Sequence, residues 1–244
     1  MAISTNSIIH YTKSIDSLKK ILEEGFLVNY CNEEVISSEN GRQSAAFPMV
    51  SFCDIPLSHV KEHLKSYGNF GIGLHKDWAN KQKLNPVLYF DKESELTNYF
   101  RIEFKRFNEK YKKNEIPFED FEHLIKFFSY SKNYEGNLLN NPKYRFYNER
   151  EWRYVPNIKT LKDAKPWVYK ETYNKDKKKF NDELNHIRLT FEPKDISYII
   201  IKDEKDIKEI LPFIRNLFSN KCSMQELEIL LTRIITTDQI QFDF

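Results

Sequence analysis

Short β-prone apolar runs alternate along this chain with segments whose apolar residues recur every three or four positions. The runs lie at 8–11, 47–53, 86–90, 186–191, 197–201 and 231–236. Helical spacing is found at 15–22, 57–66, 204–218 and 223–230. Strands and helices interleaved in this order predict an α+β fold. At 244 residues the chain is long enough to bury most of its unfolded surface, which is consistent with one domain over 1–244.

A second helical pattern extends that core between about 92 and 130. Residues 131–148 are rich in Asn and Tyr and predict a long loop, so we interpret 92–148 as a helical insert in the domain. The Lys-rich segment 175–179 is better interpreted as a solvated loop than as a binding patch.

Charge and cysteine content exclude several classes of protein. Lys and Arg number 38 and Asp and Glu 36, so the formal net charge is only +2 and any polyanion must be bound locally. No apolar run approaches the roughly 20 residues of a membrane span. The three cysteines form no CxxC pair, and no basic, apolar leader is visible at the start. We expect a soluble, cytoplasmic protein.

The segment Glu149–Val155 alternates like a strand and ends at Pro156. This alternation predicts that Glu149, Glu151 and Arg153 lie on one face. Two carboxylates so close together raise the pKa of one of them, as in many acid–base pairs. The alternative is that both glutamates only pair with Arg150, Arg153 or a neighbouring strand.

The sequence His59-Val-Lys-Glu-His63 matches the H-x-x-E-H pattern of one class of zinc peptidases. A third ligand would have to come from elsewhere in the chain. Histidines at polar helix positions are common, so we favour a structural role and expect no metal. Motifs of serine hydrolases and phosphate-binding loops are absent from the sequence.

Three blocks follow one another in a suggestive order: His10-Tyr11-Thr12, then a buried strand with Ser51, then the acidic strand with Glu149 and Glu151. This order resembles the ADP-ribosyltransferase superfamily. The resemblance implies a split β-sheet core, NAD as substrate and a macromolecule as acceptor. It implies Glu151 as the catalytic carboxylate and Glu149 as its assistant.

The same resemblance implies that the NAD-binding residues are His10, Tyr11, Thr12, Ser51, Tyr67 and Tyr89. A carboxylate near the ribose would stabilise the positive charge that develops when the nicotinamide bond breaks. His10 would hydrogen-bond the adenosine ribose, Ser51 would shape the nicotinamide pocket, and Tyr67 and Tyr89 would stack on the nicotinamide ring. The alternative for each residue is a purely structural role: a core histidine for His10, a buried serine for Ser51 and core tyrosines for Tyr67 and Tyr89.

A closer resemblance is to the AbiGi family of abortive phage-resistance proteins. The blocks that carry it span 9–26, 48–58, 67–78, 85–89, 149–155 and 195–202, among them P-M-V-S-F-C-D-I-P-L-S and E-R-E-W-R-Y-V. This likeness implies a role in phage defence, through abortive infection or a toxin–antitoxin pair. The alternative to a transferase is a catalytically silent antitoxin or phage-sensing protein with a cognate partner. A protein, DNA or RNA acceptor stays open.

Overall fold

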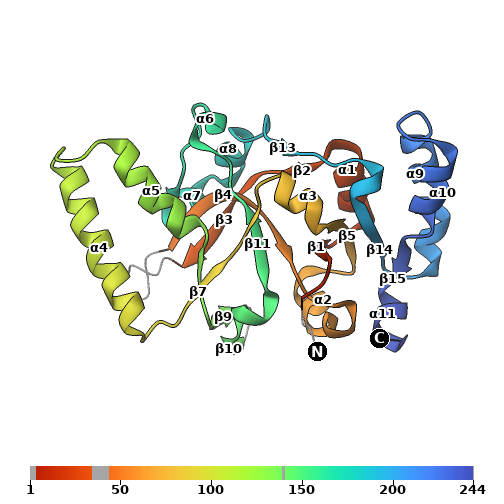
Figure 1. The fold of residues 1–244 in the computed structure, drawn as a ribbon, viewed down its shortest axis with the longest axis horizontal. Coiled ribbons are helices and arrows are strands. Elements are labelled where there is room, and N and C mark those ends of the chain that lie inside the picture. The colour runs from red at the N-terminus through yellow and green to blue at the C-terminus, as the bar shows by residue number, and fades with distance from the viewer. Residues whose placement is uncertain (1–3, 35–43, 139–140, 244) are drawn as a thin grey trace. The chain divides into compact units, whose positions relative to one another are not determined.

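The computed structural model describes residues 4–34, 44–138 and 141–243, and the chain divides into two compact units. The first unit comprises Met1–Leu27, Ser51–Leu84 and Arg188–Phe244. The second comprises Val28–Val50 and Asn85–Ile187. Figure 1 shows the elements of both, and each is described by itself below. The mixed content of helices and strands confirms the α+β class, whereas the transferase-like sheet and the single domain stay predictions.

The first unit is built on a mixed sheet. Its strand order is β15-β14-β5-β1-β4, and only β14 and β15 run parallel. The strands are β1 (Ser7–Thr12), β4 (Ser44–Cys53, of which 51–53 belong here), β5 (Phe70–His75), β14 (Ile196–Ile201) and β15 (Ile234–Thr236). A small ladder joins β2 (Phe26–Leu27) to β13 (Arg188–Leu189).

The helices of this unit begin and end where the sequence gives clear signals. The first helix, α1 (Ile15–Glu24), is capped by the Ser14 side chain and ends at Gly25, whose φ is 82°. The others are α2 (Lys61–Tyr67), α3 (Lys76–Lys81), α9 (Ile207–Phe218), α10 (Met224–Leu231) and α11 (Thr237–Asp243), with short 3-10 turns η1 (Leu57–His59), η3 (Pro193–Asp195) and η4 (Glu204–Asp206). The predicted helix over 57–66 is therefore broken at Val60, between η1 and α2.

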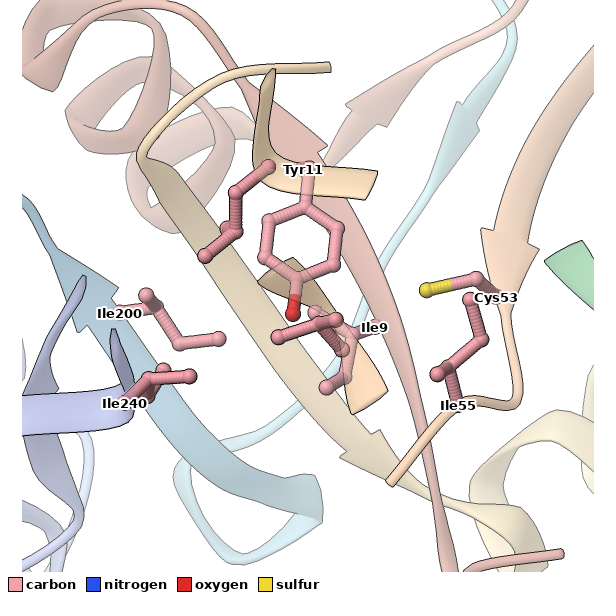
Figure 2. Close-up of a cluster of buried hydrophobic side chains, with 8 residues drawn as sticks. Ile9, Tyr11, Cys53, Ile55, Ile200 and Ile240 are labelled. Carbon is pink, nitrogen blue, oxygen red and sulfur yellow. The ribbon is translucent and has the colours of Figure 1, made fainter. Parts of the chain in front are cut away.

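A cluster of buried side chains fills this unit between its sheet and α2 and α11. Figure 2 shows Ile200 and Ile240 on one side of Tyr11. Cys53 and Ile55 lie on its other side. The Tyr11 hydroxyl points into this cluster near Ile9 and has no hydrogen-bond partner among the described residues. Tyr11 is therefore a core residue of the first unit.

In the second unit, strands pair around the first part of β4. Strand β3 (Asn29–Glu34) and strand β12 (Val168–Tyr169) both pair antiparallel with β4, in which Ala46 is opposite Asn32 and Val168. Strand β6 (Asn85–Pro86) pairs with β11 (Glu151–Tyr154), β7 (Leu88–Phe90) with β8 (Ser131–Asn133), and β9 (Gly136–Leu138) with β10 (Asn141–Tyr144). The pattern of 29–34 carried no clear period, and the sequence did not predict β3.

Two long helices confirm the helical pattern expected over about 92–130. These are α4 (Glu95–Lys112) and α5 (Phe118–Ser129), whose aromatic faces pack with Phe47 and Met49 of β4. The predicted loop over 131–148 is wrong for its described part, which holds β8, β9, β10 and η2 (Phe146–Glu149). The Lys-rich segment 175–179 is also not a loop: it spans the end of α7 (Lys170–Lys175) and the start of α8 (Lys177–Asp182), which follow α6 (Ile158–Leu161).

Gly68 gives the first prediction. Its φ is +114°, and a Cβ built there would lie 2.3 Å from the backbone oxygen of Thr12. Both the conformation and the contact with β1 exclude a side chain. We expect Gly68→Ala to lower the free energy of unfolding by about 2–4 kcal/mol, measured by urea denaturation. The exposed Lys65→Ala in the same turn of α2 should cost about 0.5 kcal/mol or less. Equal losses for the two variants would contradict this account.

Candidate functional site

The candidate acidic pair Glu149 and Glu151 does not lie on one strand. Glu149 ends the 3-10 turn η2, and Glu151 begins β11. Arg150 between them adopts a left-handed conformation, with φ 47° and ψ 50°. The prediction that both glutamates alternate along one strand face is therefore wrong for Glu149, because the chain turns at Arg150 before the strand starts.

The two carboxylates nevertheless meet at one lysine. The Lys132 ammonium lies 2.7 Å from Glu149 Oε2 and 2.8 Å from Glu151 Oε2. Strand pairing places this lysine, because Lys132 in β8 is the register partner of Tyr89 in β7. The Tyr89 hydroxyl in turn accepts a hydrogen bond of 2.8 Å from the backbone N–H of Glu151. Three of the predicted site residues thus meet in the second unit.

Arg153 also pairs with Glu151. Its Nε donates to Glu151 Oε1 at 2.6 Å and its Nη2 to Glu151 Oε2 at 3.0 Å, a bidentate pair. The Nη2 atom also donates to Glu33 Oε1 at 2.7 Å, and Nη1 donates to the Ser129 carbonyl at 2.8 Å. Arg153 is completely buried, and Glu149 and Glu151 are 3% and 5% exposed. We call Glu33, Lys132, Glu149, Glu151 and Arg153 the ion cluster.

The ion cluster fixes the charge of Glu151. Burial by itself would raise the pKa of the Glu151 carboxyl, but Arg153 and Lys132 outweigh it and hold the pKa well below the ordinary value. At Glu33 the effect of burial is the larger one, so the pKa of this carboxyl is raised although Arg153 and Lys132 oppose the shift. Burial also raises the pKa of the neighbouring Cys31 thiol to about 12, with a further contribution from Glu33. This thiol is therefore unreactive at neutral pH.

His10 and Ser51 come together in the first unit. His10 Nδ1 donates to the backbone carbonyl of Ser51 at 2.8 Å, and the imidazole packs edge-on against Phe26 and Phe52. Burial lowers the pKa of His10 below its ordinary value, although the bond to Ser51 opposes the shift. The ring is thus neutral at pH 7, with one nitrogen bonded to the backbone. This geometry favours the core-histidine interpretation over a ribose contact.

The remaining candidates of the first unit lie around α2. Tyr67 stacks on His63 with 4.2 Å between ring centroids, and Tyr11 lies against the same His63 ring at 5.3 Å. Thr12 ends β1, and its carbonyl abuts Gly68. Of these residues, Tyr11 and Tyr67 contact aromatic or apolar neighbours, as expected of core tyrosines.

The zinc alternative requires His59 and His63 on one helix face. His59 instead lies in η1, is exposed and bonds Ser58, whereas His63 is buried in α2 against Tyr67. Among the described residues, no group of three or more His, Cys, Asp or Glu could hold a metal ion.

Sequence reasoning missed two members of the ion cluster, Lys132 and Glu33. Lys132 stands in a segment predicted as a loop, and Glu33 in one with no clear period. Arg153 is one of the partners that the structural alternative offers for the glutamates, and the structure confirms its pairing with Glu151. No local signal identified Lys132, because strand pairing between β7 and β8 is what brings it to the glutamates.

The comparisons with known proteins agree with the family resemblance. Residues 24–202 match a family model described as "Putative abortive phage resistance protein AbiGi, antitoxin". The chain belongs to the AbiGi family. The abortive phage resistance protein AbiGi of Lactococcus lactis subsp. cremoris is 27% identical over 250 residues, which cover 90% of this chain and 99% of that protein. All five residues of the ion cluster fall inside the family region.

No solved structure matches the chain. Within the described part of the chain, no helix has the length and apolar character needed to cross a membrane.

The burial of Arg153 gives a stability prediction. Arg153→Leu leaves the Glu151 and Glu33 carboxylates buried without their guanidinium, so we expect a loss of about 3–5 kcal/mol in the free energy of unfolding. Arg188→Leu removes the partly exposed pair between Arg188 and Glu24 and should cost about 1 kcal/mol or less. Urea denaturation of both variants measures the difference. Similar costs would show that the ion cluster contributes no more than a surface pair.

The opposite pKa shifts of Glu151 and Glu33 give a pH prediction. A lowered pKa contributes stability at pH values above the ordinary 4.5, and this contribution is lost as the pH falls. Glu151→Gln should therefore flatten the acid loss of stability. Glu33 has a raised pKa, so its contribution is lost as the pH rises, and Glu33→Gln should leave the acid loss in place. Chemical denaturation across the acid range tests both, and an unchanged acid limb in Glu151→Gln would contradict the assignment.

Proposed function

We propose that this chain is the antitoxin of an abortive phage-resistance system and that it acts by binding its cognate toxin, not by catalysis. One observation carries the choice between binding and catalysis: both oxygens of Glu151 are occupied by Arg153 and Lys132 inside a buried ion cluster. A transferase carboxylate must reach a substrate ribose. Here the same oxygens neutralise two buried cations, which is a structural role.

Family membership supports the same proposal, because the matched family is described as an antitoxin. The relative from Lactococcus lactis is named for abortive phage resistance. The neutral His10, bonded to the Ser51 carbonyl and surrounded by Phe26 and Phe52, adds support because it acts as a core side chain.

A second candidate function is NAD-dependent ADP-ribosyl transfer to a macromolecule. One observation favours it: Glu149, Glu151 and Tyr89 all meet at one point of the second unit, as a two-carboxylate site requires. In this role Glu151 would stabilise the ribose cation and Glu149 would orient the acceptor.

Glu149→Gln separates the two functions with little change in shape. The amide can still accept a hydrogen bond from Lys132, which keeps its pair with Glu151. We expect this variant to neutralise the cognate toxin as well as the wild type does, measured by growth of cells that express both proteins. We also expect the toxin to co-purify with the wild type and with the variant.

The transferase requires the opposite results. Labelled NAD incubated with the purified chain and host lysate should then transfer label to a macromolecule, and both Glu149→Gln and Glu151→Gln should abolish the transfer. Circular dichroism and thermal unfolding of each variant show whether a loss comes from misfolding. Loss of neutralisation in a folded Glu149→Gln that still binds the toxin would contradict the binding proposal.

A further inference from the structure

Positive charge is concentrated in residues 159–179, although the net charge of the whole chain is small. The segment holds eight lysines, Lys159, Lys162, Lys165, Lys170, Lys175, Lys177, Lys178 and Lys179, and three acids, Asp163, Glu171 and Asp176. Its net charge is +5, whereas the chain as a whole carries +2, so all other residues together carry −3. We call these eight residues the lysine surface.

All eight lysines are exposed, on α6, α7, α8 and the segment that follows α6. Within the described residues, none of them pairs with a carboxylate. Asp176 is engaged otherwise, because its side chain accepts the backbone N–H of Lys179 and caps α8. Lysines in the first turn of a helix oppose its dipole, so Lys177, Lys178 and Lys179 do not stabilise α8. Folding stability therefore does not explain their clustering.

Hydrogen bonds hold the elements of the lysine surface together. The Tyr30 hydroxyl donates to the Lys165 carbonyl at 2.5 Å, and the Tyr173 hydroxyl donates to the Tyr30 carbonyl at 2.8 Å. Asn181 in α8 accepts the Tyr30 N–H at 3.0 Å, and His186 bonds the Thr160 carbonyl at 2.9 Å. In Figure 1, α8 accordingly lies beside β3, with α7 next to it. The lysines thus belong to one ordered part of the second unit.

An exposed aromatic side chain lies among these lysines. Tyr169 is 54% exposed in β12, directly before Lys170, and the Trp167 ring contacts it edge-on at 4.7 Å. Binding of an acidic protein surface would require only the lysine charges and not the exposed aromatic ring. A nucleic-acid single strand uses both features, because its phosphates attract lysines and its unpaired bases stack on exposed aromatic rings.

We propose that the lysine surface binds single-stranded nucleic acid, with the lysines on the phosphates and Tyr169 stacked against a base. The lysine surface shares no residue with the ion cluster, and the proposal does not depend on toxin binding. RNA and DNA share the phosphate and base chemistry, and the experiment distinguishes them.

The test measures fluorescence anisotropy of labelled oligouridine and oligothymidine of about 20 nucleotides, and of a duplex, with the purified full chain at about 50 mM salt. We expect binding to the single strands that weakens with salt. The variant Lys177→Gln/Lys178→Gln/Lys179→Gln should lower affinity about tenfold or more and reduce the slope of log affinity against log salt by about 2, because a single strand contributes about 0.7 per lost phosphate contact.

The matched control is Lys110→Gln/Lys112→Gln/Lys113→Gln, which removes three exposed charges at the end of α4. It changes the net charge equally and should leave binding unchanged. Tyr169→Ala should weaken binding to single strands by about fivefold or more while leaving the salt slope in place.

Three results would overturn the proposal. The first is that no nucleic acid binds, and the second is that the two triple-lysine variants lose equal affinity. The third is that polyglutamate binds and oligonucleotides do not, which would assign the surface to an acidic protein. Tighter binding of the duplex than of either single strand would refute the stacking role of Tyr169. Because the assay contains no toxin, its outcome is independent of the neutralisation test.

Discussion

The buried guanidinium of Arg153 requires anionic partners, and much of the second unit is arranged to supply them. Moving a charge out of water costs several kcal/mol, which only close, hydrogen-bonded counter-ions offset. Glu151 supplies two oxygens and Glu33 one, and the Ser129 carbonyl accepts a further hydrogen bond. These partners come from β11, β3 and the end of α5, so the arginine links three elements that are distant in sequence. Lys132 pairs with the third carboxylate, Glu149, and also with Glu151.

This arrangement explains why residues that look catalytic can be structural. Glu149 and Glu151 are separated by one residue and were candidates for a catalytic pair, and in the structure both carboxylates meet at one lysine. Their partners, however, are the protein's own cations, and the pKa of Glu151 is held far below the range useful for proton transfer at neutral pH. The proposed binding of a toxin requires a stable shape, and the ion cluster contributes to the stability of the second unit.

The distribution of charge matters more than its sum. A net charge of +2 gives no indication of a polyanion partner. The lysine surface departs from that average because its eight cations lie within 21 residues and are held on one part of the second unit by Tyr30 and Tyr173. The sequence pattern of 175–179 was compatible with a solvated loop, whereas the structure forms the helices α7 and α8 there.

The sequence by itself determined the α+β class, the strands β1, β4 and β14, and the helices α1 and α9, because their apolar periodicity and caps are local signals. It also placed Arg153 and Glu151 on one strand face and offered their pairing as an alternative to a catalytic role, since residues two apart on a strand share a face. Only the tertiary structure decided that Lys132 reaches both glutamates, that Arg150 turns the chain before β11 and that Glu33 completes the ion cluster. The positions of Lys132 and Glu33 depend on the pairing of β7 with β8 and of β3 with β4. Strand pairing joins residues far apart in the chain, and a local pattern contains no information about which strands will be neighbours.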